Sequence, residues 1–200
     1  MKIADFTARI AATPLAAHAN AAPWEVTSNL EQIVALALAS LSPGYRVSGG
    51  QAVHGRAVIE EGATLKGSLI IGPACFVAKT AYLRGGVFMD EGCIVGPGAE
   101  LKSTLMLKGA KLAHLNFVGD SVLGAGVNIE AGAIVANYRN ERADKRISFT
   151  HRGDVLDTGV EKFGAIIGDN ARIGANAVIA PGAALDAGTI VPRLSLVDMG

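Results

Sequence analysis

The chain has 200 residues, which is enough for one domain with a sizeable hydrophobic core. Half of the residues are hydrophobic but only 5% are aromatic, so small aliphatic side chains must build that core. The 18 basic and 18 acidic residues balance, which argues against bulk nucleic-acid binding and against a polybasic surface for membranes.

The first part of the chain, residues 1–48, forms an N-terminal arm with no repeat. It has an acidic residue at position 5 and no continuous apolar run, so we expect no signal peptide and a cytoplasmic protein. The segment Ser28-Asn29-Leu30-Glu31 is typical of a capping box and predicts a helix that runs to about Leu41. We expect this helix to cap or flank the rest of the domain.

Residues 49–192 carry an aliphatic residue at every sixth position, and a small residue usually follows four positions later. A period of six is neither helical nor a simple strand alternation, and it is typical of short strands separated by turns. We therefore predict an all-β solenoid, a parallel β-helix of hexapeptide repeats in which each coil buries the face of its neighbour. The aliphatic positions are Val53, Ile59, Leu65, Ile71, Val77, Leu83, Met89, Val95, Leu101, Leu107, Phe117, Leu123, Ile129, Val135, Ile167, Ile173, Ile179, Leu185 and Val191.

The repeat is interrupted in two places. Leu107 and Phe117 are two residues too close for the period, so we expect the wall of the solenoid to be deformed between them. Between Val135 and Ile167 the chain has an inserted loop, about residues 138–162, that is rich in charge. Long loops that leave a compact fold are usually functional or belong to an interface. Residues 193–200 form a short C-terminal tail.

Three basic residues, Lys66, Arg84 and Lys102, are 18 positions apart and should stand side by side on successive coils. Their side chains should face outward, about 5 Å from one another. Cations at that spacing repel unless an anion lies among them, so the column is either a solvated stripe or a phosphate site. Cys75 and Cys93 have the same spacing at inward positions, where we expect two buried, small hydrophobes.

His114 lies inside the first interruption of the repeat. Irregularities in regular elements are often functional, and an imidazole titrates close enough to neutral pH to act as a general base. A structural role in a turn is the alternative for a lone histidine. The other histidines do not gather near it in the sequence, so no metal site is predicted.

Two segments of the chain resemble a known enzyme family. The stretches Lys111-Leu-Ala-His114-Leu-Asn-Phe-Val-Gly-Asp120 and Val127-Asn128-Ile-Glu-Ala131-Gly resemble the acetyltransferase domain of bifunctional N-acetylglucosamine-1-phosphate uridylyltransferase/glucosamine-1-phosphate acetyltransferase. The later segment Asp157–Asp169 is similar to archaeal-type sugar-1-phosphate nucleotidylyltransferase relatives, and Pro23-Trp24 resembles their inter-domain linker. The resemblance covers most of residues 23–190.

The resemblance implies a left-handed β-helix, a homotrimer, and direct transfer of an acetyl group from acetyl-coenzyme A to the amine of glucosamine 1-phosphate. In this family the catalytic base matches His114. The substrate contacts fall on Arg84, Lys102 and Asn128, and on Phe117, which stands where the family has a tyrosine. The coenzyme contacts fall on four further residues, Ala131, Asn137, Tyr138 and Ala175.

The sequence also departs from the family. Ala143 replaces an expected lysine, for which Arg142, Lys145 or Arg146 could substitute, and Glu130 replaces a glycine beside the presumed coenzyme channel. The chain is too short to include the nucleotidyltransferase domain, so that activity is expected on a separate protein. The acceptor is therefore open between an amino-sugar phosphate and a nucleotide-linked amino sugar. Two alternatives also stay open, a non-catalytic sugar-nucleotide-binding or scaffold protein and an O-acyltransferase.

Overall fold

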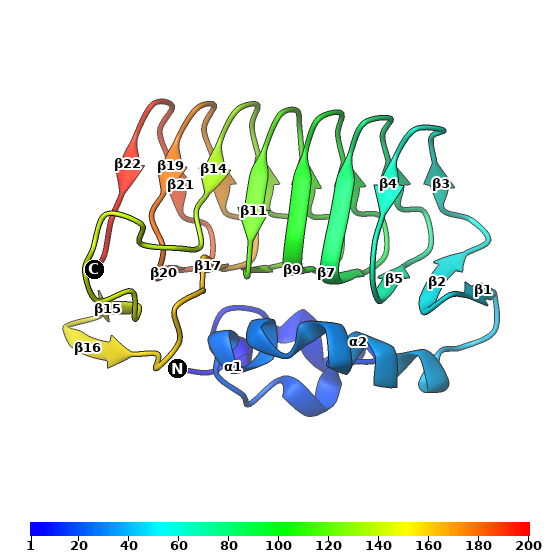
Figure 1. Ribbon diagram of the computed structural model, residues 1–200, viewed down its shortest axis with the longest axis horizontal. Coiled ribbons are helices and arrows are strands. Elements are labelled where there is room, and N and C mark those ends of the chain that lie inside the picture. Colours follow the sequence, from blue (N-terminus) through cyan, green and yellow to red (C-terminus); the bar gives the residue numbers. More distant parts are fainter.

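The computed structural model describes residues 1–200 as a three-sided solenoid with a helical arm along one side (Figure 1). The fold is the expected left-handed parallel β-helix of hexapeptide repeats, with about eight turns. Every strand pair along the solenoid from β2 onward is parallel, and the strands of successive turns stand in three rows. None of the helices has the length and apolar composition that a membrane crossing requires.

The first row faces the helical arm, the third row is the face in front in Figure 1, and the second row lies behind it. The first row holds β2 (Gln51–His54), β5 (Leu69–Ile71), the second halves of β7 (Tyr82–Met89) and β9 (Glu100–Met106), β12 (Val122–Leu123), β17 (Ala165–Ile167) and β20 (Ala183–Leu185). The second row holds β3 (Val58–Ile59), β6 (Phe76–Val77), β8 (Ile94–Val95), β10 (Lys111–Leu112), β13 (Asn128–Ile129), β18 (Arg172–Ile173) and β21 (Ile190–Val191). The third row holds β4 (Thr64–Leu65), the first halves of β7 and β9, β11 (Phe117–Gly119), β14 (Ile134–Val135), β19 (Val178–Ile179) and β22 (Leu196–Val197).

The interior of the solenoid is filled by one aliphatic and one small side chain from each turn of the repeat, as the period predicts. The predicted inward positions Leu107 and Phe117 are wrong, because the core instead contains Met106 and Val118. The two missing residues are lost one at a time, between Leu101 and Met106 and again between Val118 and Leu123. Two adjacent apolar residues stand at each place, Met106-Leu107 and Phe117-Val118, so the period alone could not show which of the two points inward.

Both shortened steps fall at the corner that leads from the third row into the first row. The register between β7 and β9 shifts there, because Gly85 and Gly86 turn the corner on one coil and Ser103 turns it on the next. Ser103 and Asp120 each adopt a φ of 46°, the left-handed region that tight corners require. The deformation of the wall therefore lies next to Lys102, whereas the turn that holds His114 keeps the regular spacing.

The predicted helix exists, but its α-helical part ends at Ala37, before Leu41, and a separate short helix precedes it. The helix α1 (Pro23–Ser28) starts at a proline, whose fixed φ suits a first helical turn, and the carboxylate of Glu25 accepts the amide of Ala22 at 3.1 Å. The helix α2 (Leu30–Ala37) follows after Asn29, which makes no side-chain cap, so the capping box predicted at Ser28 is wrong. Before these helices come η1 (Ile3–Asp5), η2 (Ala8–Ala12) and η3 (Ala16–His18), and after them come η4 (Leu38–Ser40) and β1 (Tyr45–Ser48), which pairs antiparallel with β2.

The helical arm flanks the first row and does not cover an end of the solenoid (Figure 1). It closes over a column of outward side chains that stand in register and are almost fully buried: Ala52, Ile70, Phe88, Leu105, Val122, Ile166 and Ala184. The inserted loop takes part as well, because it contains the hairpin of β15 (Ser148–His151) and β16 (Asp154–Asp157). The ring of Trp24 contacts Phe149 and Phe163 edge-on, at centroid distances of 6.1 and 5.7 Å.

Candidate functional site

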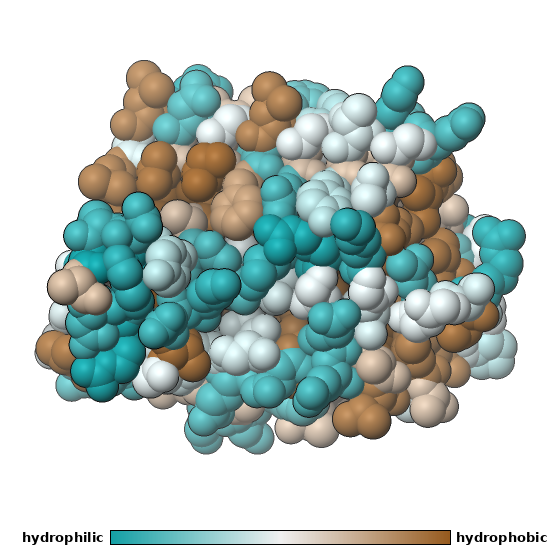
Figure 2. All heavy atoms as spheres, in the orientation of Figure 1, coloured by the Kyte–Doolittle hydropathy of each residue, from teal (hydrophilic) through white to brown (hydrophobic).

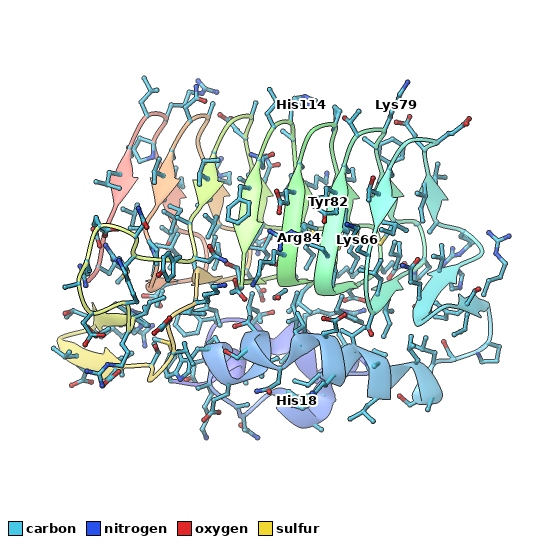
Figure 3. All side chains as sticks on the ribbon, in the orientation of Figure 1. His18, Lys66, Lys79, Tyr82, Arg84 and His114 are labelled. Carbon is cyan, nitrogen blue, oxygen red and sulfur yellow. The ribbon has the colours of Figure 1, made fainter.

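The basic column stands on the third row, with Arg84 of β7 directly opposite Lys102 of β9 (Figure 3). The structure also contains the anions that the spacing argument required. Arg84 Nε donates to Glu100 Oε1 at 2.7 Å, and Lys102 Nζ lies 2.7 Å from both carboxylate oxygens of Asp120. Carboxylates of this chain therefore relieve the repulsion and hold the basic groups in place.

These basic groups border a hollow of about 470 Å³ in the third row. Figure 2 shows hydrophilic side chains gathered over the middle of this face. The lining residues are Arg84, Lys102, Phe117, Asn137, Tyr138, Glu161 and Lys162. The first five were predicted as site residues from the sequence. Glu161 and Lys162 were not, and they lie at the end of the charged insert, just before the repeat resumes.

One buried carboxylate joins two of the predicted site residues. The Asp120 side chain is 5% exposed, and it accepts hydrogen bonds from Lys102 Nζ and from Asn137 Nδ2. It lies at one of the two shortened corners, where its backbone is left-handed, and it lines a neighbouring hollow that shares Lys102, Glu161 and Lys162 with the first one. The sequence indicated Asp120 only as a member of the family motif. Its role as a hydrogen-bond acceptor was not predicted, because its two partners are 18 and 17 positions away in the chain.

His114 is exposed at the corner between the second and third rows, on the upper edge in Figure 3. It does not line the hollow. The strand β11 connects the two places, with the His114 turn at its beginning and Gly119, the register partner of Lys102, at its end. His114 and Gly119 are five positions apart, and the chain turns at Leu115 before Phe117 begins the strand.

Ala131 and Ala175 occupy the same edge of the solenoid as His114. The amide of Gly132 donates to the carbonyl of His114 at 2.9 Å, and the amide of Asn176 donates to the carbonyl of Ala131 at 3.0 Å. Three predicted site residues therefore follow one another on successive turns. Asn128 lies apart from them, exposed on the second row, where it pairs in register with Arg172.

The departures from the family also have definite places. The ring of Phe117 faces outward into the hollow, opposite to the inward direction that the repeat predicted. Among the basic residues near Ala143, Lys145 has its Nζ 5.6 Å from the ring centroid of Tyr138, whereas Arg146 is paired with Asp144 at 2.8 Å. Among the three basic residues near Ala143, Lys145 is therefore the one seen over the ring of a predicted coenzyme contact.

Glu130 has two partners at the His114 edge. Its carboxylate accepts the backbone amide of Ala175 at 2.9 Å and the guanidinium of Arg193 at 2.9 Å. The hydrogen bond from Arg193, followed by that from Ala175, holds the pKa of Glu130 below its usual range. Glu130 is therefore an anion at neutral pH and is already engaged with one of the predicted coenzyme contacts.

The remaining reactive side chains do not form a second site of this kind. Cys75 and Cys93 are buried in the core as expected, and donation of the Cys93 thiol hydrogen to Cys75, together with burial, raises the pKa of Cys93. No group of three or more His, Cys, Asp and Glu side chains stands close enough to hold a metal ion. The chemistry of the chain therefore concentrates on the third row and on the edge that holds His114.

The fold and the site together define a class, a hexapeptide-repeat β-helix with a cationic hollow beside an exposed histidine edge. No model of a known protein family matches the chain. The chain is 31% identical over 182 residues to the bifunctional protein GlmU of Methanococcus vannielii, covering 88% of this chain and 43% of that protein. It is 31% identical over 141 residues to the bifunctional sugar-1-phosphate nucleotidylyltransferase/acetyltransferase of Sulfurisphaera tokodaii, covering 68% of this chain and 35% of that protein.

These matches confirm the resemblance to the bifunctional family that the motifs predicted. The chain spans less than half of the length of either relative. Among solved structures, it is similar to AntD, an N-acyltransferase from Bacillus cereus in complex with dTDP and 3-hydroxybutyryl-CoA, with 18% identity and a TM-score of 0.45 over 73% of this chain and 71% of that one. It is also similar to the acetyltransferase domain of PglB from Neisseria gonorrhoeae, with 14% identity and a TM-score of 0.40 over 86% and 60%.

Proposed function

We propose that the chain is an acetyl-coenzyme A-dependent N-acetyltransferase that acts on a glucosamine-1-phosphate-like sugar or on a nucleotide-linked amino sugar. The observation that carries the proposal is the position of the basic column and its hollow on the same face of the solenoid as the exposed edge of His114. The confirmed resemblance supports the same assignment, because the matched relatives are named as acetyltransferases or as bifunctional proteins of that family.

The acceptor would bind with its phosphate toward the basic end of the hollow. Arg84 and Lys102, held by Glu100 and Asp120, would donate further hydrogen bonds there, and Lys162 adds a third basic group to the lining. Guanidinium and ammonium groups are the usual protein ligands of phosphate. Phe117 lies between this end and the His114 turn, so a sugar ring that spans the two would lie across the ring of Phe117.

His114 would act as the general base. The amine of an amino sugar is an ammonium at neutral pH, and it must lose a proton before it can attack a thioester. This first proton passes to solvent, and the imidazole would take the second proton of the amine as its nitrogen bonds to the thioester carbonyl carbon. The carbon–sulfur bond then breaks, and the imidazolium returns the proton to the leaving thiolate, so the products are the N-acetyl sugar and coenzyme A.

Acetyl-coenzyme A would lie along the edge that begins at His114. Ala131 and Ala175 follow on successive turns of that edge, so their backbones can contact an extended coenzyme arm whose thioester reaches the imidazole. Asn137 and Tyr138 line the hollow beside this edge and would bind the same co-substrate. Asn128 would contact the sugar, and its place on the second row separates it from the hollow of its own chain.

A homotrimer would resolve that separation, because the second row of one copy can face the third row of another. The outward residues of the third row become apolar toward the C-terminal end, where four stand in register: Phe117, Ile134, Val178 and Leu196. Leu196 is 68% exposed in the single chain, and Figure 2 shows a brown apolar area over β14, β19 and β22. Exposed apolar patches of this kind mark interaction surfaces.

The test is an acetyl-transfer assay with acetyl-coenzyme A and a panel of amino-sugar phosphates and nucleotide-linked amino sugars, in which the released thiol is measured. We expect turnover with at least one amine acceptor and at least a 100-fold loss of kcat in His114→Ala, in line with general-base contributions. His18→Ala is the matched control, because His18 lies in the helical arm far from this edge. No turnover, full activity of His114→Ala, or a preference for hydroxyl acceptors would reject the proposal.

A further inference from the structure

The edge that holds His114 continues past Ala175 to Arg193, on the next turn of the solenoid. The amide of Leu194 donates to the carbonyl of Ala175 at 3.0 Å, which extends the same series of turn-to-turn bonds. The order along the edge is therefore His114, Ala131, Ala175 and Arg193. Three turns separate the imidazole from Arg193, about 14 Å at the usual spacing of parallel strands.

The ion pair between Glu130 and Arg193 crosses this edge. Glu130 belongs to the turn of Ala131, and Arg193 stands two turns further on, so their side chains meet over the turn that holds Ala175. Arg193 Nε lies 2.9 Å from Glu130 Oε2, and its Nη2 lies 3.1 Å from Oε1. The same Oε2 accepts the amide of Ala175. The carboxylate of Glu130 thus binds the backbone amide of Ala175 and the guanidinium of Arg193 at the same time.

This ion pair is open to solvent. The side chain of Arg193 is 72% exposed and that of Glu130 is 39% exposed. Exposed ion pairs contribute little because water screens them and two long side chains must be ordered. A ligand with stronger acceptors, such as the phosphates of a nucleotide-bearing coenzyme, can therefore displace the carboxylate from the guanidinium.

The space beside the pair has room for such a ligand. A hollow of about 250 Å³ adjoins it on the second row, lined by residues that include Asn128, Glu130, Arg172 and Arg193. Arg172 is exposed and is not among the arginines that form an ion pair. Once Glu130 is released, this hollow presents two guanidinium groups, and the Ala175 amide beside it becomes free to donate.

We propose that Glu130 and Arg193 form a latch over the coenzyme edge. In the closed state Glu130 occupies the Ala175 amide and neutralises Arg193, and binding of acetyl-coenzyme A opens the latch as its phosphates take the guanidinium. Glu130 is then a residue that weakens coenzyme binding, and Arg193 is a phosphate ligand. The proposal rests on the proposed function, because it assumes that acetyl-coenzyme A binds along the His114 edge.

The test measures the dissociation constant of coenzyme A by titration calorimetry, without any acceptor. Removing the competing carboxylate in Glu130→Ala should tighten binding about two- to fivefold, which is the size expected for one exposed charge pair. Glu130→Gln keeps an acceptor for the Ala175 amide but loses the charge, so it should tighten binding less. Glu91→Ala is the matched control, because Glu91 forms an equally exposed pair with Lys108 at a different corner and should change nothing.

Arg193 is tested by the pair of variants Glu130→Ala and Glu130→Ala/Arg193→Ala. If Arg193 binds phosphate, the double variant should bind coenzyme A more weakly than Glu130→Ala, and the two should bind pantetheine, which has no phosphate, equally. Higher salt should reduce the difference for coenzyme A. Each variant is checked by thermal unfolding, and exposed positions of this kind should leave Tm unchanged.

The outcomes separate the two proposals. Coenzyme binding that is equal in wild type and in Glu130→Ala, or tighter in the double variant than in Glu130→Ala, overturns the latch and leaves the acetyltransferase assignment intact. Coenzyme binding with the predicted variant effects, but no acetyl transfer to any acceptor, supports the latch and rejects the proposed reaction. No binding of coenzyme A to any variant rejects both.

Discussion

The first and third rows of the solenoid have the same repeating backbone but opposite surroundings. On the first row, the outward column from Ala52 to Ala184 is almost fully buried under the helical arm and the β15–β16 hairpin. On the third row, the outward positions include Tyr82, Glu100 and Phe117, which stay partly exposed beside a hollow that the end of the insert also lines. The covered row therefore serves stability, and the polar side chains that bear on chemistry lie on the open row and its edge.

The comparison shows that the backbone of the repeat does not decide where a site forms. A hexapeptide strand has one side chain inside and its neighbour outside, and the inner positions are alike in all three rows. The outer position is free to vary. It is apolar on every turn of the first row, which is covered, whereas the other two rows also carry polar outer residues and stay open. The following predictions test this division, from the largest expected effect to the smallest.

The largest effect is expected on the covered row. Phe88 is 2% exposed and fills the space between β7 and the helical arm, so Phe88→Ala should lower the free energy of unfolding by about 3–5 kcal/mol. Chemical denaturation measures the loss. Phe76→Ala is the control, because Phe76 has the corresponding outward position on the uncovered second row and is only half-buried. An equal loss at Phe76 would contradict the division between rows.

The open row should show the reverse behaviour. Arg84 is half-exposed and its ion pair with Glu100 is partly in water, so Arg84→Ala should change stability little. Loss of a charge-assisted hydrogen bond to a phosphate should raise KM for the phosphorylated acceptor about 10- to 100-fold. Lys66→Ala is the matched control from the same column, since Lys66 does not line the hollow. The same rise of KM in both variants would contradict a specific phosphate contact.

A third prediction concerns the C-terminal tail, where Arg139 is buried and binds Asp198 and the carbonyl of Pro181. The hydrogen bond from Arg139 lowers the pKa of Asp198 to about 2, from an ordinary 3.8. Because the pKa is lower in the folded state, the pair stabilises the protein above about pH 4, and the stabilisation disappears as the pH falls toward 2.

Asp198→Asn should therefore lower the free energy of unfolding at pH 7 by about 1 kcal/mol, since the Asp198 side chain is 37% exposed and solvent screens part of the pair. The difference from wild type should shrink as the pH falls through 2 and vanish below it. Asp144→Asn is the control, because Asp144 also has a pKa of about 2, set by Arg146, but is fully exposed. A difference between wild type and Asp198→Asn that does not shrink between pH 4 and pH 2 would show that the carboxylate charge is not the cause.

The smallest effect is expected at Phe117. Its ring faces the hollow, so Phe117→Tyr would place a hydroxyl among the polar lining groups without disturbing the core. A neutral hydrogen bond to the acceptor would raise kcat/KM about two- to tenfold. Steady-state kinetics with the best acceptor measures the change, and a decrease would indicate that the acceptor packs an apolar surface against this ring.

Much of the candidate site was predictable, because side-by-side placement in a solenoid follows from residue spacing. The column of Lys66, Arg84 and Lys102 was found in this way, and the family motif added Asn137 and Tyr138 to the same hollow. The carboxylates of Asp120 and Glu100 were not predicted as partners, because each acidic residue by itself looks like part of a solvated face in the sequence. Their pairing depends on the corner geometry, which the spacing does not specify.

The sequence by itself determined the solenoid, because a six-residue period of aliphatic side chains can be buried in a three-sided coil and in neither a helix nor a flat sheet. The tertiary structure alone decided which row is covered, which of two neighbouring apolar residues points inward at Met106 and Val118, and how Glu130 meets Arg193 across 63 positions of chain. The physical reason is the distance along the chain over which each interaction acts. The six-residue period specifies contacts between successive turns. The helical cover, the corners and the ion pairs join residues that come together only after the whole coil has formed.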